Sequence, residues 1–159
     1  MTWKSLTLIL ALLGFVSAAA AKPLTDGGVR IYMKSGAYEE VRLDLKDAIV
    51  DRGFKIDYNG HVGDMLKRTA DDVGAKKSVF KNAEFFNFCS ASVSRRAVEA
   101  DPRAIGFCPY TLFVYELESQ PGQIRVGYRR PALLGSEEAR KALTDLDKLL
   151  DQIARTALQ

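Results

Sequence analysis

Asn87-Phe88-Cys89-Ser90 holds the first of the two cysteines in this chain, and Gly106-Phe107-Cys108-Pro109 holds the second. The apolar run Tyr110–Tyr115 follows directly. Between the cysteines, residues 90–101 predict a short helix, because Ser90 can cap its start and Asp101-Pro102 would end it. Neighbouring strands before and after this helix would bring the cysteines together. We therefore expect a Cys89–Cys108 disulfide that holds the helix to a sheet.

The apolar run belongs to the strongest strand of the sequence, which we expect over residues 105–117. Because it is apolar on both faces, it should be central in the sheet and covered on both sides. A turn at Gln120-Pro121-Gly122 then leads into the second strand of a hairpin. In that strand, one face carries Ile124, Val126 and Tyr128.

Three further strands are expected over residues 29–33, 54–58 and 83–89. Strict alternation in the second of these places Phe54, Ile56 and Tyr58 inward, and Asn59-Gly60 should turn the chain after it.

Amphipathic helices alternate with these strands. Apolar residues at helical spacing predict a helix over residues 37–52 that ends at Gly53, and another over residues 62–73 that ends at Gly74. The last helix follows the capping Ser136, and one of its faces carries Leu143, Leu146, Leu150 and Ile153. This order predicts an α+β fold, a mixed or antiparallel sheet with helices packed on one face and a long C-terminal helix.

The start of the chain predicts export. A single lysine precedes the apolar block Leu6–Val16, and residues 17–21 are rich in alanine, as in a signal peptide cleaved after Ala21. An uncleaved anchor is the alternative, but the block is shorter than the about 20 residues of an ordinary spanning helix. We expect a signal peptide at residues 1–21, a leader at residues 22–28 and a single domain at residues 29–159. The mature protein would be periplasmic or secreted, with no stable membrane anchor.

The composition indicates a globular protein and argues against nucleic acid as a partner. A hydrophobic content of 47% with 27% charged residues is ordinary for a soluble domain. The net charge is only +3, and the basic residues are scattered apart from Arg95-Arg96 and Arg129-Arg130. Nucleic-acid binders concentrate Lys and Arg on one face, so we expect no nucleic-acid partner.

Four stretches form a recognisable set: Gly53-Phe54 after an amphipathic helix, Asn59–Met65, Cys108–Glu116 and Val126–Pro131. Together they resemble the family known as domain of unknown function 302, over residues 29–131. The resemblance implies a small α+β domain in a family whose members pack as dimers. It transfers no catalytic residue, because the family has no agreed activity. The Phe-Cys pairs, the export signal and the long C-terminal helix depart from the family pattern and suggest a periplasmic branch.

The cysteine pair has two interpretations. In an oxidising compartment two cysteines without others usually form a structural disulfide. Alternatively, Cys89 lies at a helix start, where the dipole lowers the pKa of a thiol, and Cys108 precedes Pro109, so the pair could perform redox chemistry. The spacing is not Cys-x-x-Cys and the neighbours are aromatic, which favours the structural interpretation.

His61 and Met65 are the candidate metal ligands. His61 is the only histidine, and Met65 lies one helical turn later on the same face. With a cysteine, these donors could ligate copper or haem iron. Alternatively, Met65 belongs to the core and His61 simply starts the helix. The sequence identifies no cofactor.

Catalytic motifs are missing from the sequence: it shows no nucleophile elbow, no glycine-rich phosphate loop and no recognisable set of acid, base and nucleophile. The aromatic content of residues 85–115 is high, which indicates a well-filled core or else a groove or subunit interface. Arg129 and Arg130, at a strand end, could receive an anionic group. The candidate ligand-binding residues are His61, Met65, Tyr110, Tyr128, Arg129 and Arg130.

The sequence therefore favours an exported, non-catalytic domain that binds a small apolar or anionic ligand, or a partner protein, in the periplasm. We expect a homodimer, because one layer of helices can cover only one face of the Tyr110–Tyr115 strand and a partner subunit is the simplest second cover. The alternative is a redox or metal/haem accessory protein that uses Cys89 and Cys108 with His61 and Met65.

Overall fold

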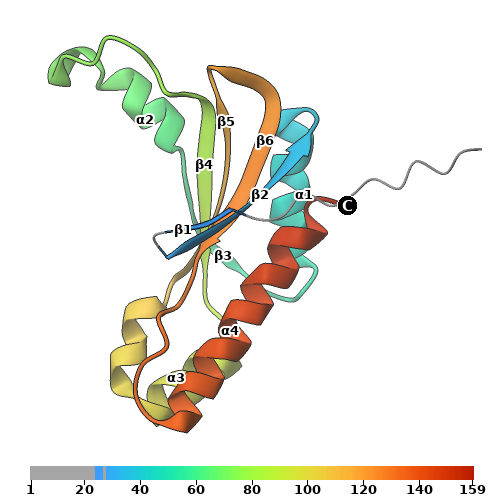
Figure 1. Ribbon diagram of the computed structural model, residues 1–159, viewed down its shortest axis with the longest axis vertical. Coiled ribbons are helices and arrows are strands. Elements are labelled where there is room, and N and C mark those ends of the chain that lie inside the picture. The colour runs from blue at the N-terminus through green and yellow to red at the C-terminus, as the bar shows by residue number, and fades with distance from the viewer. Residues whose placement is uncertain (1–23, 27) are drawn as a thin grey trace, which may run out of the picture.

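A computed structural model describes residues 24–26 and 28–159, which form one antiparallel sheet with helices packed against it (Figure 1). The strand order is β1-β2-β6-β5-β4-β3, and all neighbours are antiparallel. The strands are β1 (Leu24–Asp26), β2 (Val29–Ser35), β3 (Ile56–Gly60), β4 (Phe80–Phe88), β5 (Tyr110–Leu117) and β6 (Gln120–Arg129). The α+β prediction is confirmed. The predicted signal peptide lies outside the described residues, and β1 lies within the segment expected to be a leader.

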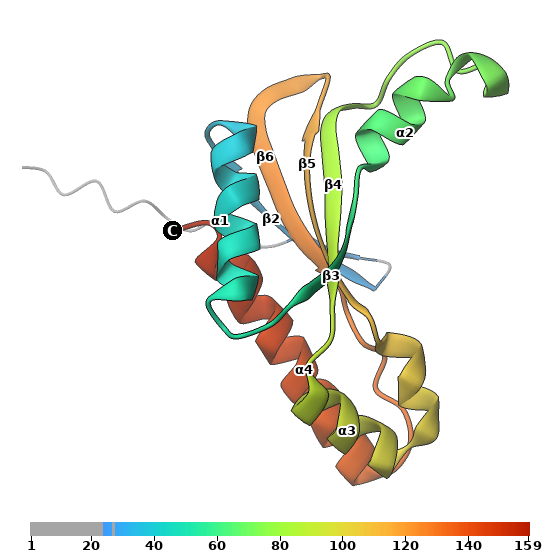
Figure 2. The same ribbon diagram turned by 180° about the vertical axis from the view of Figure 1, so that it is seen from behind.

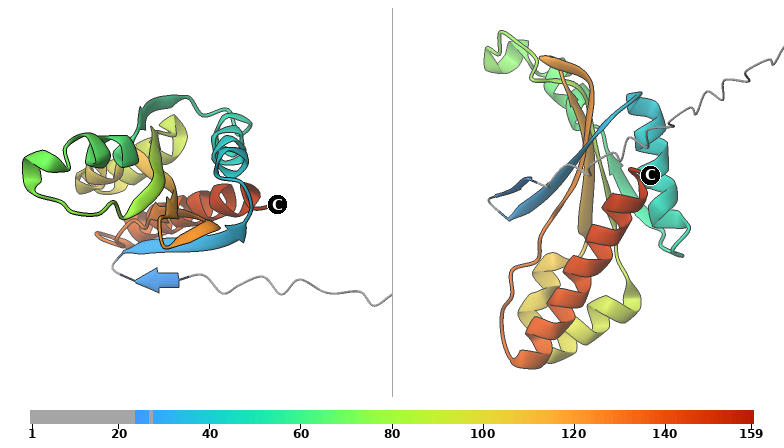
Figure 3. Two further views of the ribbon diagram at one scale, coloured as in Figure 1. Left: turned by 90° about the horizontal axis from the view of Figure 1, so that it is seen from above. Right: turned by 45° about the vertical axis from the view of Figure 1, so that its right-hand side comes forward.

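Two of the four α-helices in the described residues cover one face of the sheet. The helices are α1 (Tyr38–Val50), α2 (Val62–Arg68), α3 (Ala91–Ala100) and α4 (Glu137–Thr156), with short 3-10 helices η1 (Asp71–Val73) and η2 (Pro102–Phe107). Seen from above, the sheet curves around α1 and α4, while α2 lies outside it (Figure 3). The long C-terminal helix is confirmed, and the side chains of its predicted apolar face are at most 1% exposed. Within the described part of the chain, no helix is long and apolar enough to cross a membrane.

Strand β5 is central, as predicted, and within the described part of the chain it is covered on one face only. Its burial alternates residue by residue: Leu112 and Val114 are 0% exposed, whereas Phe113 and Tyr115 are half-buried. The second cover that the sequence predicts, a partner subunit, stays a prediction. Helices α1 and α4 both pack on the same face of the sheet, and α2 reaches only β4 on the other. We call the second face the open face.

The helix predicted between the cysteines is confirmed as α3. The hydroxyl of Ser90 accepts a hydrogen bond from the backbone N–H of Val93 at 3.4 Å, which caps the start of α3. Cys89 and Cys108 form a disulfide with their Cα atoms 5.9 Å apart, so the end of β4 is linked to the start of β5. Helix α3 then packs against the first half of α4, below the sheet (Figure 2).

Several strand boundaries differ from the prediction, for example the start of β4 at Phe80 instead of Ala83. Residues 105–107 belong to η2, so β5 begins at Tyr110. The hairpin turns at Glu118-Ser119, and Gln120 already begins β6. In β3, Asn59 and Gly60 pair with β4 instead of turning the chain.

The prediction that Tyr58 points inward is also wrong, because the side chain is 59% exposed. The pairing of β3 with β4 shifts between Ile56 and Tyr58. Such a bulge inserts an extra residue, so the residues after it change face.

Helix α2 is shorter and less buried than predicted. It ends at Arg68, although Gly74 adopts the predicted left-handed conformation after η1. The apolar stripe expected to pack inward is exposed: Met65 by 41%, Leu66 by 44% and Val73 by 74%. Only Gly63 of α2 is buried. The segment projects beyond the sheet in Figures 1 and 2.

A polar network holds α4 to the edge of the covered face. Asp151 accepts hydrogen bonds from the guanidinium groups of Arg30 at 2.9 Å and Arg155 at 2.8 Å, and from the hydroxyl of Tyr32. Burial alone would raise the pKa of Asp151, but these hydrogen bonds outweigh it and lower the pKa to about 2. The carboxylate is therefore charged at neutral pH.

Candidate functional site

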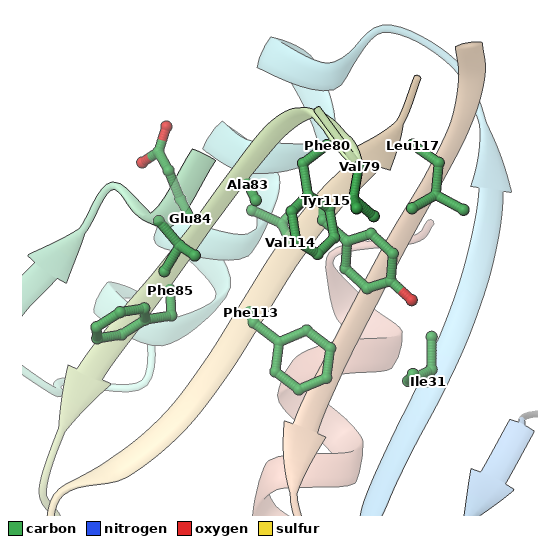
Figure 4. Close-up of a pocket in the computed structure, with 11 residues that line it drawn as sticks. Ile31, Val79, Phe80, Ala83, Glu84, Phe85, Phe113, Val114, Tyr115 and Leu117 are labelled. Carbon is green, nitrogen blue, oxygen red and sulfur yellow. The ribbon is translucent and has the colours of Figure 1, made fainter. Parts of the chain in front are cut away.

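A groove of about 460 Å³ lies on the open face, within the range of small-molecule sites (Figure 4). We call it the open-face groove. Its lining comes from β2, β4, β5 and the start of α2, together with the loop that leads into β4. The lining residues are Ile31, Val62, Val79, Phe80, Ala83, Glu84, Phe85, Phe113, Val114, Tyr115 and Leu117.

The register of the sheet places the groove side chains in one row. Phe85 is paired with Phe113, Phe113 with Gly127, and Gly127 with Ile31. A Cβ atom at Gly127 would lie 2.6 Å from the ring of Phe113 and from the carbonyl oxygen of Arg30. The missing side chain at Gly127 therefore leaves the space that the Phe113 ring occupies.

The aromatic residues of β4 and β5 divide between the two faces of the sheet. Phe86, Phe88 and Tyr110 point toward the helices and are at most 4% exposed. Phe85, Phe113 and Tyr115 alternate with core residues along β4 and β5 and line the groove. The sequence predicted either a well-filled core or a groove. Both are present, on opposite faces of the same strands.

The interior of the groove carries little charge. The carboxylate of Glu84 points away from the apolar side chains in Figure 4, and it accepts a hydrogen bond from the amide nitrogen of Asn59 at 3.0 Å. Burial raises the pKa of Tyr115, although the guanidinium of Arg125, 5.6 Å from its ring centre, acts in the opposite direction. The phenol is therefore neutral at physiological pH. A ligand would meet apolar walls and one hydroxyl group.

The predicted donor set of cysteines, histidine and methionine is not brought together. His61 lies just before α2, with its Nδ1 3.6 Å from a carboxylate oxygen of Glu84, and the exposed Met65 lies in the same helix. Cys89 follows the opposite end of β4, Cys108 precedes the neighbouring start of β5, and the two are bonded to each other. In residues 24–26 and 28–159, no group of three or more His, Cys, Asp or Glu side chains is arranged to hold a metal ion.

The other four candidate ligand residues lie away from the groove. Tyr110 shares a hydrogen bond of 2.7 Å with the hydroxyl of Ser94, and the hydroxyl of Tyr128 donates to Asp151 at 3.3 Å. Arg130 donates two hydrogen bonds to Asp147, at 3.0 and 3.2 Å, so its charge is used to bind α4. Arg129 is exposed beside a small hollow near Pro109.

A comparison with protein-family models matches residues 31–157 to the family described as "Domain of unknown function DUF302". The chain belongs to the DUF302 family. The match extends beyond the residues 29–131 expected from the resemblance and includes α4. In this DUF302 chain the long C-terminal helix is therefore part of the family domain, and the expectation that it departs from the family pattern is wrong.

The DUF302 chain is also similar to a solved structure, the crystal structure of an uncharacterized conserved DUF302 protein from Bacillus stearothermophilus. The two are 17% identical, with a TM-score of 0.67, and the match covers 82% of this chain and 98% of the other. At this level of identity the similarity shows a shared fold. The comparison with curated proteins found no match.

Proposed function

We propose that this protein is an exported, non-catalytic DUF302 domain of a periplasmic branch, and that it binds a small apolar ligand in the open-face groove. The observation that carries the proposal is the groove itself: Phe85, Phe113 and Ile31 line a hollow of about 460 Å³ on a sheet face that no long helix of residues 28–159 covers. Burying apolar ligand surface there would contribute about 25 cal/mol per Å².

Export is supported by the signal-like pattern of residues 1–21 and by the Cys89–Cys108 disulfide, which suits an oxidising compartment. N-terminal sequencing of protein from the periplasmic fraction should begin at or near Lys22. Recovery of the full-length chain from the cytoplasm would contradict export.

Native mass spectrometry of protein purified from its own periplasm tests ligand binding, because it reports a bound organic molecule, a metal or a haem by mass. The proposal expects an apolar organic molecule. The Phe113→Ser variant should lose it, whereas Leu43→Ser, which removes an apolar side chain that is 44% exposed on α1, should retain it. A bound metal or haem, or a ligand retained by both variants, would refute binding in the groove.

We also propose that two copies of the domain associate through the open face. Beyond the groove this face exposes Met33 by 38% and Tyr58 by 59%, and the resemblance to the DUF302 family implies dimers. Light scattering should give a dimer at tens of micromolar protein. Tyr58→Lys should shift the equilibrium toward monomer, and a monomeric wild-type protein would contradict the proposal.

A further inference from the structure

The segment from Val62 to Val79 forms an arm that projects from the sheet (Figures 1 and 2). It contains α2, η1 and the loop into β4. Four large apolar side chains of the arm are exposed by 41% to 74%, namely Met65, Leu66, Val73 and Val79. None of these four side chains belongs to the buried core, so core packing does not account for the exposed apolar surface of the arm.

The arm encloses a second hollow, of about 380 Å³, which we call the arm hollow. Leu66, Val73 and Val79 line it. Val79 also lines the open-face groove, so the two hollows adjoin at this apolar side chain. A ligand that extends past Val79 would have one part in each hollow.

The two hollows differ in charge. The arm hollow is lined by Lys67, Lys76 and Lys77 and by no carboxylate, since the aspartates of the arm lie outside the lining. The amine of Lys67 is engaged, because it donates a hydrogen bond to the carbonyl oxygen of Lys81 at 2.8 Å. Lys76 and Lys77 are exposed, and neither has an ion-pair partner among the described residues.

We infer that the ligand is a single-chain amphiphile with an anionic head group, its hydrocarbon chain in the open-face groove and its head at Lys76 and Lys77. The inference rests on the proposed function and adds the chemical class of the ligand. An apolar groove binds a hydrocarbon chain by the hydrophobic effect, and two ammonium groups in the adjoining arm hollow select a negative charge. A carboxylate and a phosphate head share this chemistry.

Isothermal titration calorimetry of the mature chain tests the inference, with each probe below its micellar concentration. The probes are dodecanoate, dodecyl phosphate, dodecanol and dodecyltrimethylammonium. The two anions should bind at least about tenfold more tightly than the alcohol, and the cation more weakly than the alcohol. Shortening dodecanoate should weaken binding about threefold to fourfold per methylene group removed. The ratio of the two anions distinguishes a carboxylate from a phosphate source.

Charge reversal locates the head group. K76E/K77E should weaken anion binding about tenfold or more and reduce its salt dependence, while the affinity for dodecanol stays unchanged. The matched control K46E/K55E reverses two exposed lysines outside the arm and should change neither affinity. Val79→Asp, at a position that is 64% exposed and shared by both hollows, should weaken all probes.

Different negative results separate failure of the head-group assignment from failure of the proposed function. Equal affinity for dodecanol and dodecanoate, with no effect of K76E/K77E, would overturn the head-group assignment and leave the apolar ligand in place. Failure of every probe to bind the wild-type protein would overturn the proposed function as well. Binding to anionic vesicles without binding to any monomeric probe would also overturn the inference, because the arm would then be a membrane-docking element.

Discussion

The two faces of the sheet are made by the same strands, yet they are buried to very different degrees. Phe85 and Phe86 are adjacent residues of the same type on β4, but Phe86 is 1% exposed and Phe85 lies half-buried in the groove. Neither propensity nor hydrophobicity distinguishes them. The difference comes from α1 and α4, which pack on one face only. The covered face should therefore determine stability, and the open face should determine binding.

The largest effect is expected on the covered face. Phe86→Ala should lower the free energy of unfolding by about 3–5 kcal/mol, because it removes a fully buried ring and leaves a cavity. Urea denaturation followed by circular dichroism measures this change. The fraction that remains folded should bind ligand with unchanged affinity. A loss below about 1 kcal/mol would mean that the covered face is not the stabilising core.

The second largest effect on stability is expected for the disulfide, which links the end of β4 to the start of β5. Its cysteines are 19 residues apart, so C89S/C108S should lower the free energy of unfolding by about 3 kcal/mol through the released chain entropy. Ligand binding by the folded protein should persist. A redox role predicts the reverse, a small loss of stability with complete loss of function. Thiol titration of freshly isolated native protein should find no free thiol.

The third largest effect on stability is expected at the polar edge of the covered face, where Asp151 accepts hydrogen bonds from two arginines and a tyrosine. Its pKa is lowered from 3.8 to about 2 in the folded protein, so the unfolded chain binds a proton more readily. The contribution of Asp151 to stability is therefore fully present above about pH 4 and is lost as the pH falls toward 2, by about 2 kcal/mol in total.

Urea denaturation at several pH values measures this loss. Asp151→Asn should flatten the acid limb of the profile, whereas Asp57→Asn, at an exposed position on β3, should leave it unchanged. An unaltered acid limb in Asp151→Asn would contradict the role of this network.

The smallest change in stability is expected on the open face. Phe85→Ala should lower the free energy of unfolding by only about 1 kcal/mol, because the ring is half-exposed and its aromatic neighbour is the exposed Tyr58, at 5.8 Å between ring centres. The same variant should abolish or strongly weaken ligand binding, measured by calorimetry. Together with Phe86→Ala it forms a matched pair, and equal stability losses in both would remove the distinction between the faces.

Local signals were sufficient wherever an element carries its own start, stop and packing face. Ser136 and the leucine stripe located α4, and Ser90 with Asp101-Pro102 located α3. The cysteine pairing followed from the cysteine count, the oxidising compartment that the N-terminal pattern predicts and the strand pattern. These predictions held because capping and helical periodicity act within a few residues.

The candidate site was only partly predictable. The sequence singled out Phe85, Phe113 and Tyr115 within an aromatic surplus, but it also proposed Tyr128 and Arg130, which hold α4 in place instead. Strand alternation assigns residues to two faces, and both faces of β5 are apolar, so the pattern alone did not show which face the helices would cover. The lysines of the arm were missed because they line a hollow only once the loop after η1 runs back to β4 beside α2 (Figure 1).

The sequence by itself determined the α+β class, the disulfide and the apolar face of α4, because each rests on short-range chemistry. Only the tertiary structure decided that Tyr58 points outward, that α2 leaves its apolar stripe exposed and which face of the sheet stays open. An amphipathic pattern records that a side can be buried, but burial requires a partner surface. Here the partners, α1 and α4, are supplied from opposite ends of the domain and meet on the same face.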